Sequence, residues 1–428
     1  MAEALPLADA CRFLERRAER ILAPRRQRAG LPPLGLSGGT LEIRREPYGV
    51  VLVIGPSNYP LFLPGVQVLQ ALVAGNATIV KPGRQGSDAM RALQHILLAS
   101  GLESDLLGVL DESTDSARSA IASGVDKVVL TGSAATGRAV LEELAPRLVP
   151  AAVELSGCDA VFVLESADLN MVARAVAFGL RLNAGATCIA PHRVFVPHGM
   201  VDDLEARLVA ALRGASCTVD EHVARRALDL VSDALDQGAR LLTGRIEPGS
   251  IFEPVVLADA SPTMRLLQAD VFAPVVSLVS VEDEQGALRA SVQCPYALGA
   301  SVFGDEAPAR DLARAIRAGV VVINDIIAPT AHPAVPFGGR GESGYGTTRG
   351  AEGLIEMTRP KAIVTRRGRW RPHYSQASRA DAALARHILR AVHGRGFRQR
   401  LEAIAAAVRT AVGRRTRTPG PDGGPDNA

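Results

Sequence analysis

The sequence predicts an α/β protein with two domains, each built around a mostly parallel sheet. The first observation is that short β-branched runs alternate with helical stretches between about residues 49 and 155. The second is that the same alternation returns between residues 160 and 325. The third is composition, because 428 residues with 47% hydrophobic and 22% charged side chains are typical of a folded chain with ample cores.

In the first region, each expected strand is followed by a helical stretch, which is the pattern of parallel strands joined by crossover helices. The strands are expected at residues 49–55, 77–82, 105–110, 126–132 and 151–155, and the helices at 63–75, 87–101, 113–124 and 135–146. Helices should therefore cover both faces of this sheet.

The second region repeats this order of elements. Strands are expected at residues 160–164, 193–197, 274–281, 300–304 and 320–325, and helices at 168–183 and 307–319, with one long helical stretch at 200–239. Two more strand-like segments, 41–47 and 360–366, have no local partner. We expect them to form a small separate sheet or to pair with another subunit.

Charge and cysteine usage exclude several classes of function. Residues 366–428 hold fourteen arginines and four acidic residues, a net charge of +10, which leaves −7 on the rest of the chain. An acidic body argues against nucleic-acid binding. Five scattered cysteines without a CxxC pair predict neither disulfides nor a metal site, and the N-terminus lacks the pattern of a signal peptide. We therefore expect a cytoplasmic protein.

The basic tail has a pattern of its own. Residues 380–415 place apolar side chains at helical spacing between arginines, interrupted at Gly394 and Gly396, and residues 418–428 are expected to be disordered. A basic helix with an apolar stripe is suited to peripheral contact with an anionic membrane or to covering a hydrophobic substrate entrance. A solvated extension is the plain alternative.

One turn predicts a phosphate site. The strand at 126–132 runs directly into a helix that Ser133 can cap, with Gly132 before it and Gly137 one turn inside. A helix N-terminus of this kind suits a pyrophosphate, although an ordinary strand-to-helix turn has the same form. The formal GxGxxG at residues 339–344 follows no strand and opens no helix, so we interpret it as a loop that approaches something closely.

Four further side chains are candidates for chemistry. Cys188 lies between a helix and a strand, where a thiol can face a crevice, although a lone cysteine is more often buried and inert. Glu154 interrupts an apolar strand and needs either an ion pair or a catalytic role. Asn58 and Lys81 follow strands of the first sheet, at the edge where α/β sites lie, with a turn residue and a surface lysine as the alternatives.

Together these segments resemble the aldehyde dehydrogenases, most closely the compact, class 3-like branch. The resemblance covers about residues 46–364, and it is carried in order by GPSNYP, AGNATIVKPG, TGSAATGRAV, VELSG, NAGATC, ADVFAPV and PFGGRGESGYG. It implies a Rossmann-like cofactor domain in residues 1–155, with 40–50 in an oligomerisation sheet, and a catalytic domain in 156–352. An oligomerisation strand in 353–366 and the basic tail in 367–428 would follow.

The resemblance also implies the chemistry. Cys188 would be the nucleophile, Glu154 the general base, and Asn58 an oxyanion donor beside the backbone NH of Cys188. The reaction is oxidation of an aldehyde to the acid with NAD or NADP through a thiohemiacetal and a thioester. An acylating, coenzyme A-dependent enzyme and a weakly active scaffold or membrane partner are the alternatives. The family implies a homodimer or homotetramer.

The remaining matches concern the ligands. Lys81 would contact the adenosine ribose, Gly132 and Ser133 the pyrophosphate and nicotinamide side, and Phe272 the nicotinamide ribose. Phe337 would line the substrate end.

Three departures from the family stand out. Asp270 replaces the glutamate of the motif that holds the nicotinamide ribose. Arg84 stands where a glutamate often binds the adenosine ribose, so it would suit a 2'-phosphate of NADP, or else face solvent. The N-terminal part is several tens of residues shorter than in typical members, so we expect the helical wrapping there to be missing or supplied differently.

Overall fold

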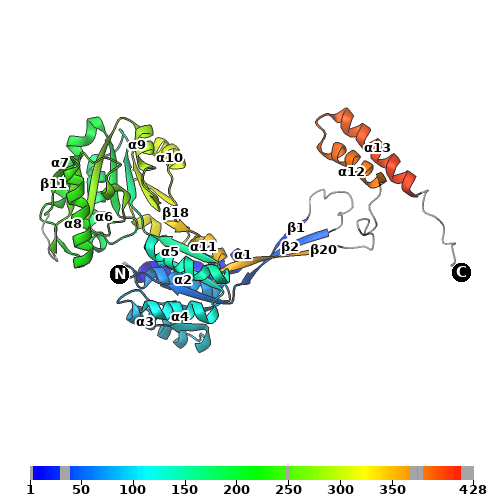
Figure 1. The fold of residues 1–428 in the computed structure, drawn as a ribbon, viewed down its shortest axis with the longest axis horizontal. Coiled ribbons are helices and arrows are strands. Elements are labelled where there is room, and N and C mark those ends of the chain that lie inside the picture. The colour runs from blue at the N-terminus through cyan, green and yellow to red at the C-terminus, as the bar shows by residue number, and fades with distance from the viewer. Residues whose placement is uncertain (1–2, 29–38, 246–250, 367–373, 375–378, 416–428) are drawn as a thin grey trace. The chain divides into compact units, whose positions relative to one another are not determined.

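The computed structural model describes residues 3–28, 39–245, 251–366, 374 and 379–415. The chain divides into two compact units, one made of Met1–Ala23 and Arg45–Pro360, and the other of Pro24–Arg44 and Lys361–Ala428 (Figure 1). Each unit is described by itself. No helix in the described ranges is long and apolar enough to cross a membrane.

The first sheet of the large unit has six strands in the order β19-β7-β6-β3-β4-β5, all parallel except β19. Its strands are β3 (Val50–Ile54), β4 (Ala77–Lys81), β5 (Leu107–Val109), β6 (Lys127–Gly132), β7 (Ala151–Leu155) and β19 (Gly344–Tyr345). The predicted alternation in the first region is therefore confirmed.

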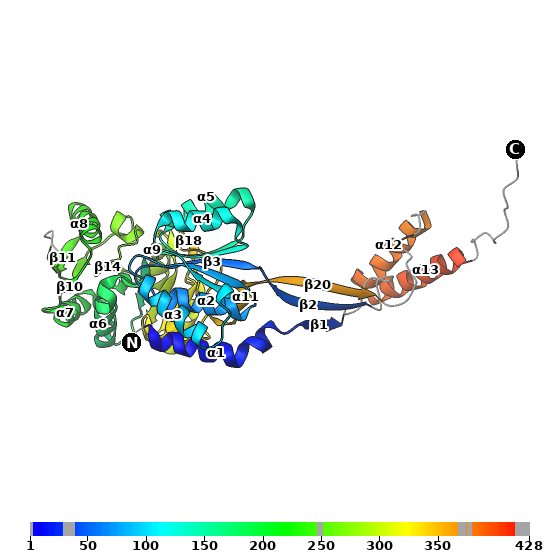
Figure 2. The same cartoon turned by 90° about the horizontal axis from the view of Figure 1, so that it is seen from below.

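Helices cover both faces of this sheet. Successive side chains of a strand point to opposite faces, and apolar side chains on both faces need to be buried. One face, with Val51 and Val53, packs against α1 (Ala4–Leu22), α2 (Phe62–Val73), α3 (Ser87–Ala99) and α11 (Gly350–Glu356). The other face, with Leu52 and Ile54, packs against α4 (Thr114–Gly124) and α5 (Ala134–Leu144) (Figure 2).

The second sheet has seven strands in the order β11-β13-β14-β9-β8-β16-β17, parallel except for β11. They are β8 (Asp159–Val163), β9 (Pro191–Pro197), β11 (Arg240–Thr243), β13 (Val255–Ala258), β14 (Val275–Val281), β16 (Gly299–Phe303) and β17 (Val320–Ile323).

One face of the second sheet packs against α6 (Leu169–Arg181) and α7 (Val201–Leu212). The other packs against α8 (Glu221–Asp236), α9 (Glu284–Ser291) and α10 (Glu306–Ala315). Two short pairs, β10 (Cys217–Thr218) with β12 (Ile251–Phe252) and β15 (Tyr296–Ala297) with β18 (Arg340–Gly341), complete the unit.

The single helical stretch expected at residues 200–239 is wrong, because α7 and α8 are separate helices. Gly214 has a φ of +70°, which few other residues adopt, and it turns the chain out of α7. The strand β10 follows, and the Asp220 side chain then accepts from the backbone NH of His222 to start α8. Local turn chemistry outweighs the continuous apolar spacing here.

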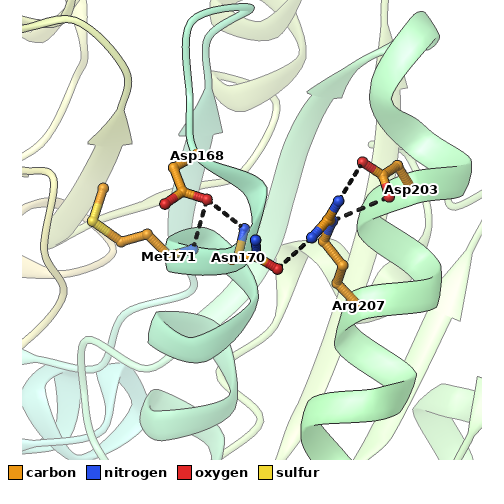
Figure 3. Close-up of polar contacts among 5 residues, drawn as sticks. All are labelled: Asp168, Asn170, Met171, Asp203 and Arg207. Atoms are coloured by element: carbon orange, nitrogen blue, oxygen red, sulfur yellow. Dashed lines mark hydrogen bonds and ion pairs between the residues drawn. The ribbon is translucent and has the colours of Figure 1, made fainter.

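The start of α6, the helix that precedes Cys188, is held by polar contacts (Figure 3). Asp168 accepts from the backbone NH groups of Asn170 at 2.8 Å and Met171 at 3.4 Å, a cap worth about 1 kcal/mol. On α7, Arg207 pairs with Asp203 and also donates to the Asn170 side chain. These bonds link the first turn of α6 to the middle of α7.

The small unit contains a sheet and two helices. Its strands β1 (Arg25–Arg28), β2 (Gly39–Pro47) and β20 (Thr358–Arg366) form one three-stranded sheet in the order β1-β2-β20. The two segments without local partners therefore lie in the same sheet. Helices α12 (Arg379–His393) and α13 (Phe397–Arg415) are separated at the two glycines that the sequence singled out. The segment 418–428, expected to be disordered, lies outside the described residues.

Candidate active site

The structure brings Cys188 and Glu154 together from two different sheets. Glu154 is the fourth residue of β7, and Cys188 lies in the loop between α6 and β9. The Cys188 Sγ lies 3.8 Å from Oε1 of Glu154. The thiol donates a hydrogen bond to the carboxylate at this distance, which is the pairing expected of a nucleophile and its base before a ligand binds.

The backbone before Cys188 is strained. Asn183 and Ala184 have φ values of +49° and +53°, a left-handed conformation that is unusual outside glycine. The Asn183 side chain donates to the carbonyl oxygens of Asn58 at 3.0 Å and Ala186 at 3.2 Å, which holds the turn in place. Such strain costs on the order of 1 to 3 kcal/mol per residue and is typical of functional sites.

Close backbone approach explains two glycines near the pair. A Cβ on Gly157 would lie 2.3 Å from the carbonyl oxygen of Cys188. At Gly344, where φ is +87°, a Cβ would lie 2.0 Å from the carbonyl oxygen of Val153, on the strand that carries Glu154. The close approach expected of residues 339–344 is therefore present at Gly344, against β7. The segment is not a plain loop, because it contains the short strand β18 and ends at β19.

Asn58 lies beside the nucleophile loop. Its side-chain amide donates to the carbonyl oxygen of Ala186 at 3.0 Å, and its Oδ1 accepts from the backbone NH of Tyr59 at 3.0 Å. Because an amide nitrogen carries two N–H groups, one of them is left over for a ligand. Next to it, the Tyr59 hydroxyl and Thr187 Oγ1 are 2.8 Å apart, which links the same two loops.

Burial sets the protonation of the pair. It raises the pKa of Glu154 to about 7, while Arg349, the Cys188 thiol and the Thr131 hydroxyl lower that pKa. Burial also raises the pKa of the Cys188 thiol well above its ordinary value; the Glu154 carboxylate raises it further and Arg349 lowers it. Oε2 of Glu154 is buried without a hydrogen-bond partner among the described residues. Such an atom is placed to accept a proton from a ligand or a water.

Arg349 is the site residue that the sequence reasoning missed. It is 6% exposed, and its Nη1 donates to the carbonyl oxygen of Thr330 at 2.7 Å. Its guanidinium lies 4.2 Å from the ring centre of Phe337 and 5.6 Å from that of Phe62. No sequence signal separates it from the other arginines of an arginine-rich chain.

Cys188 and Leu63 line two cavities in common. The first, of about 280 Å³, also contains six of the predicted residues: Asn58, Gly132, Ser133, Glu154, Asp270 and Phe272. Ser133 Oγ accepts from the backbone NH of Thr136 and caps α5 at the wall of this cavity. The second cavity, of about 460 Å³, contains Phe337 and Arg349. The nucleophile is therefore reached from two sides.

Lys81, Arg84 and Gly137 are absent from the lining of the first cavity. Lys81 ends β4, and burial lowers its pKa. Arg84 is exposed and pairs with Asp220 at 3.0 Å. A Cβ on Gly137 would lie 2.8 Å from the Leu155 side chain, so this glycine allows α5 to pack closely against β7.

Asp270 lies in the first cavity with a partner that the sequence did not indicate. Its side chain is 8% exposed, and its Oδ1 accepts from Nη2 of Arg226 at 2.6 Å. Arg226, on α8, lines the same cavity. Phe272 has a φ of +50°, so the segment after Asp270 is also held in an unusual conformation.

Comparison with known proteins gives a consistent result. The model of the aldehyde dehydrogenase family matches residues 2–363. The 4,4'-diapolycopene aldehyde oxidase of Methylomonas sp is 31% identical over 86% of this chain and 71% of that protein. The putative succinate-semialdehyde dehydrogenase (NADP(+)) 2 of Mycobacterium ulcerans is 30% identical over 85% of this chain and 73% of that protein. Among solved structures, a Mycobacterium tuberculosis aldehyde dehydrogenase complexed with NAD+ has a TM-score of 0.78 and 27% identity, over 84% of this chain and 77% of that one.

Proposed function

The chain belongs to the aldehyde dehydrogenase family and oxidises aldehydes with NAD or NADP, and we propose that Cys188, Glu154 and Asn58 carry out this reaction. The observation that supports these roles is the 3.8 Å separation of Cys188 Sγ and Glu154 Oε1 between two cavities. Substrate and cofactor can then reach the thiol from opposite sides.

The first step is attack by sulfur. Glu154 accepts the proton of the Cys188 thiol, and the thiolate forms a C–S bond to the aldehyde carbon. The carbonyl π electrons move to oxygen. That oxyanion accepts hydrogen bonds from the remaining N–H of the Asn58 amide and from the backbone NH of Cys188. Each preorganised donor contributes about 3 to 4 kcal/mol to the stability of the transition state.

The second step is hydrolysis of the thioester. When the C–H electron pair leaves as hydride, the oxygen regains its double bond and Cys188 carries a thioester. Glu154, once it has released its first proton to solvent, removes a proton from water. The water oxygen attacks the thioester carbon, the C–S bond breaks, and the carboxylic acid leaves.

The lining of the first cavity suits the pyrophosphate and nicotinamide side of a dinucleotide, whereas Lys81 and Arg84, expected near the adenosine ribose, lie outside that lining. The N-terminus of α5, capped by Ser133, presents backbone NH groups to it, and the Asp270 carboxylate beside it can accept from ribose hydroxyls. The nicotinamide ring of bound NAD or NADP supplies the hydride acceptor.

The test is formation of NADH or NADPH, followed at 340 nm, with a panel of aldehydes and each cofactor. Turnover that yields the carboxylic acid supports the proposed roles. Turnover that requires coenzyme A would replace hydrolysis by acyl transfer. Failure of both cofactors with every aldehyde, with or without coenzyme A, contradicts the proposal and favours a scaffold.

We expect Arg84 to determine cofactor preference. Its ion pair with Asp220 is exposed and therefore weak, so the guanidinium is free to turn to a 2'-phosphate. Arg84→Glu should lower kcat/KM for NADP by roughly 10- to 100-fold, since hydrogen bonds between charged groups contribute about 1.5 to 3 kcal/mol. The value for NAD should change little. Arg118→Glu, at an exposed arginine of α4, is the matched control. Equal effects of Arg84→Glu on NAD and NADP would mean that Arg84 only faces solvent.

We propose peripheral membrane contact for the basic tail. On α13, Leu401, Ile404, Val408 and Val412 are 49 to 57% exposed and recur at helical spacing between arginines. That pattern suits an anionic lipid surface. In co-sedimentation, the protein should bind vesicles with anionic phospholipid, and Ile404→Asp should reduce the bound fraction several-fold. Leu148→Asp, at an 88% exposed leucine of the large unit, is the control. Equal binding to neutral vesicles, or none at all, would contradict this proposal.

A homodimer or homotetramer is also proposed. Strand β20 is an edge of its sheet, and its residues 359–365 are exposed, as expected of a strand that pairs with another copy. Native mass spectrometry measures the assembly directly.

A cytoplasmic location stays a prediction, with which the five free cysteines are consistent.

A further inference from the structure

We infer that the second cavity takes an uncharged, long-chain aldehyde, and that helix α1 is the part of its wall that selects such a substrate. This inference rests on the proposed function, because it assumes that the aldehyde carbon reaches Cys188 from this side. It goes further in naming the class of substrate and the residues that discriminate.

The lining of the cavity is the first argument. The cavity of about 460 Å³ is large for a four-carbon aldehyde and falls within the range of roughly 300 to 1,000 Å³ found for sites that hold drug-sized ligands. Aliphatic and aromatic side chains dominate its wall, among them Leu5, Phe178, Ile189, Ile327 and Phe337. A hydrocarbon chain loses contact with water along its whole length in such a cavity, whereas a polar chain would lose hydrogen bonds.

The charges of the lining are the second argument. The basic side chains in the lining are Arg349 and His332, and the acidic side chain is Asp9. The Arg349 guanidinium already donates to the Thr330 carbonyl and lies against the Phe337 ring. Its Nε is buried and has no hydrogen-bond partner among the described residues. His332 and Asp9 are both exposed. Nδ1 of His332 accepts from the backbone NH of Ala334 at 3.2 Å, and the Asp9 carboxylate would repel the carboxylate of a charged substrate.

The attachment of α1 is the third argument. The Glu3 carboxylate accepts from the backbone NH groups of Leu61 and Phe62, both at 2.9 Å, at the start of α2. These charge-assisted bonds hold the first turn of α1 beside the cavity. Leu5 on that turn is 62% exposed and Phe178 on α6 is 41% exposed, although both line the cavity. The tail of a long aldehyde would cover both side chains.

The test compares straight-chain aldehydes from butanal to decanal with succinate semialdehyde. Full burial of a methylene group contributes about fourfold to binding. We therefore expect kcat/KM to rise at least 100-fold from butanal to decanal, and succinate semialdehyde to be poorer than butanal. Leu5→Asp should lower the ratio of kcat/KM for decanal to kcat/KM for butanal about tenfold. Ile96→Asp, at a 60% exposed position of α3 outside the cavity, should leave that ratio unchanged.

Each outcome separates this inference from the proposed function. A kcat/KM that is flat along the series, or highest for succinate semialdehyde, would overturn the long-chain class while aldehyde oxidation stands. A ratio that falls equally in both variants would remove α1 as the selecting wall. No turnover of any aldehyde would overturn the proposed function itself, and this inference with it.

Discussion

Replacing Cys188 by alanine should abolish aldehyde oxidation, with a loss in kcat of at least about 10⁴-fold. The reason is that the thiolate forms the covalent bond from which hydride leaves, and residues that act as one unit with it cannot compensate. No other described cysteine lines either cavity at the site. The measurement is the rate of NADH or NADPH formation with the best aldehyde of the panel.

The matched control is Cys217→Ala. This partly exposed cysteine lies on β10 and donates to the carbonyl oxygen of Phe252, away from both cavities. It should keep the wild-type rate. If Cys188→Ala retained more than about 1% of that rate, the covalent mechanism would be refuted.

Glu154→Gln should slow hydrolysis of the thioester more than its formation, because the Cys188 proton can also leave to solvent whereas attack by water depends on the carboxylate. Removal of a general base costs typically 10²- to 10⁴-fold. We therefore expect steady-state turnover to fall in that range, while a slow burst approaches one NADH per active site. Intact-protein mass spectrometry should show the acyl group on Cys188. Turnover without acyl accumulation would mean that another group activates water.

The pH profile identifies the same residue. Burial raises the pKa of Glu154 to about 7, and the carboxylate is the basic form. Activity of the wild type should therefore fall about tenfold per pH unit below 7 and level off above it. This inflection should be missing in Glu154→Gln. An unchanged profile in the variant would assign the inflection to another group.

A stability measurement guards against a folding defect in this variant. Because the folded state holds the proton of Glu154 more tightly than an unfolded chain does, ionising this residue destabilises the fold as pH rises from about 4.5 through 7. Glutamine avoids that cost. Glu154→Gln should therefore unfold at pH 8 at a temperature equal to or above that of the wild type.

The arrangement of the site follows from the two sheets. On β7, Glu154 pairs with β6 on one side and with β19 on the other, and this position in the sheet determines the direction of its side chain. The position of Cys188 depends on the positive φ values of Asn183, Ala184 and Gly185 and on the hydrogen bonds of the Asn183 side chain. A strand end thus supplies the base and a strained loop the nucleophile, in keeping with α/β sites that lie at the carboxyl ends of strands and on the loops there.

Much of the fold and part of the site could be predicted from the sequence, because hydrophobic periodicity and turn residues are local signals. Periodicity and β-branched runs indicated five strands of each sheet but missed β11, β13 and β19. The turn at Ser133 predicted a helix N-terminus, which lies at the first cavity. The same reasoning failed at residues 200–239. There, apolar spacing at 3.6 residues continued across Gly214, and the Asp220 cap was too weak a signal to stop it.

The sequence by itself determined the alternating order of most strands and helices, the candidate nucleophile and base, and the resemblance that connects them. Only the tertiary structure decided that Arg349 lies buried against Phe337, that Arg226 pairs with Asp270, and that Cys188 faces two cavities. The physical reason is that periodicity and capping act over a few residues, whereas burial, ion pairs and cavities depend on segments far apart in the chain. In a chain with many arginines, packing alone selects the two that matter here.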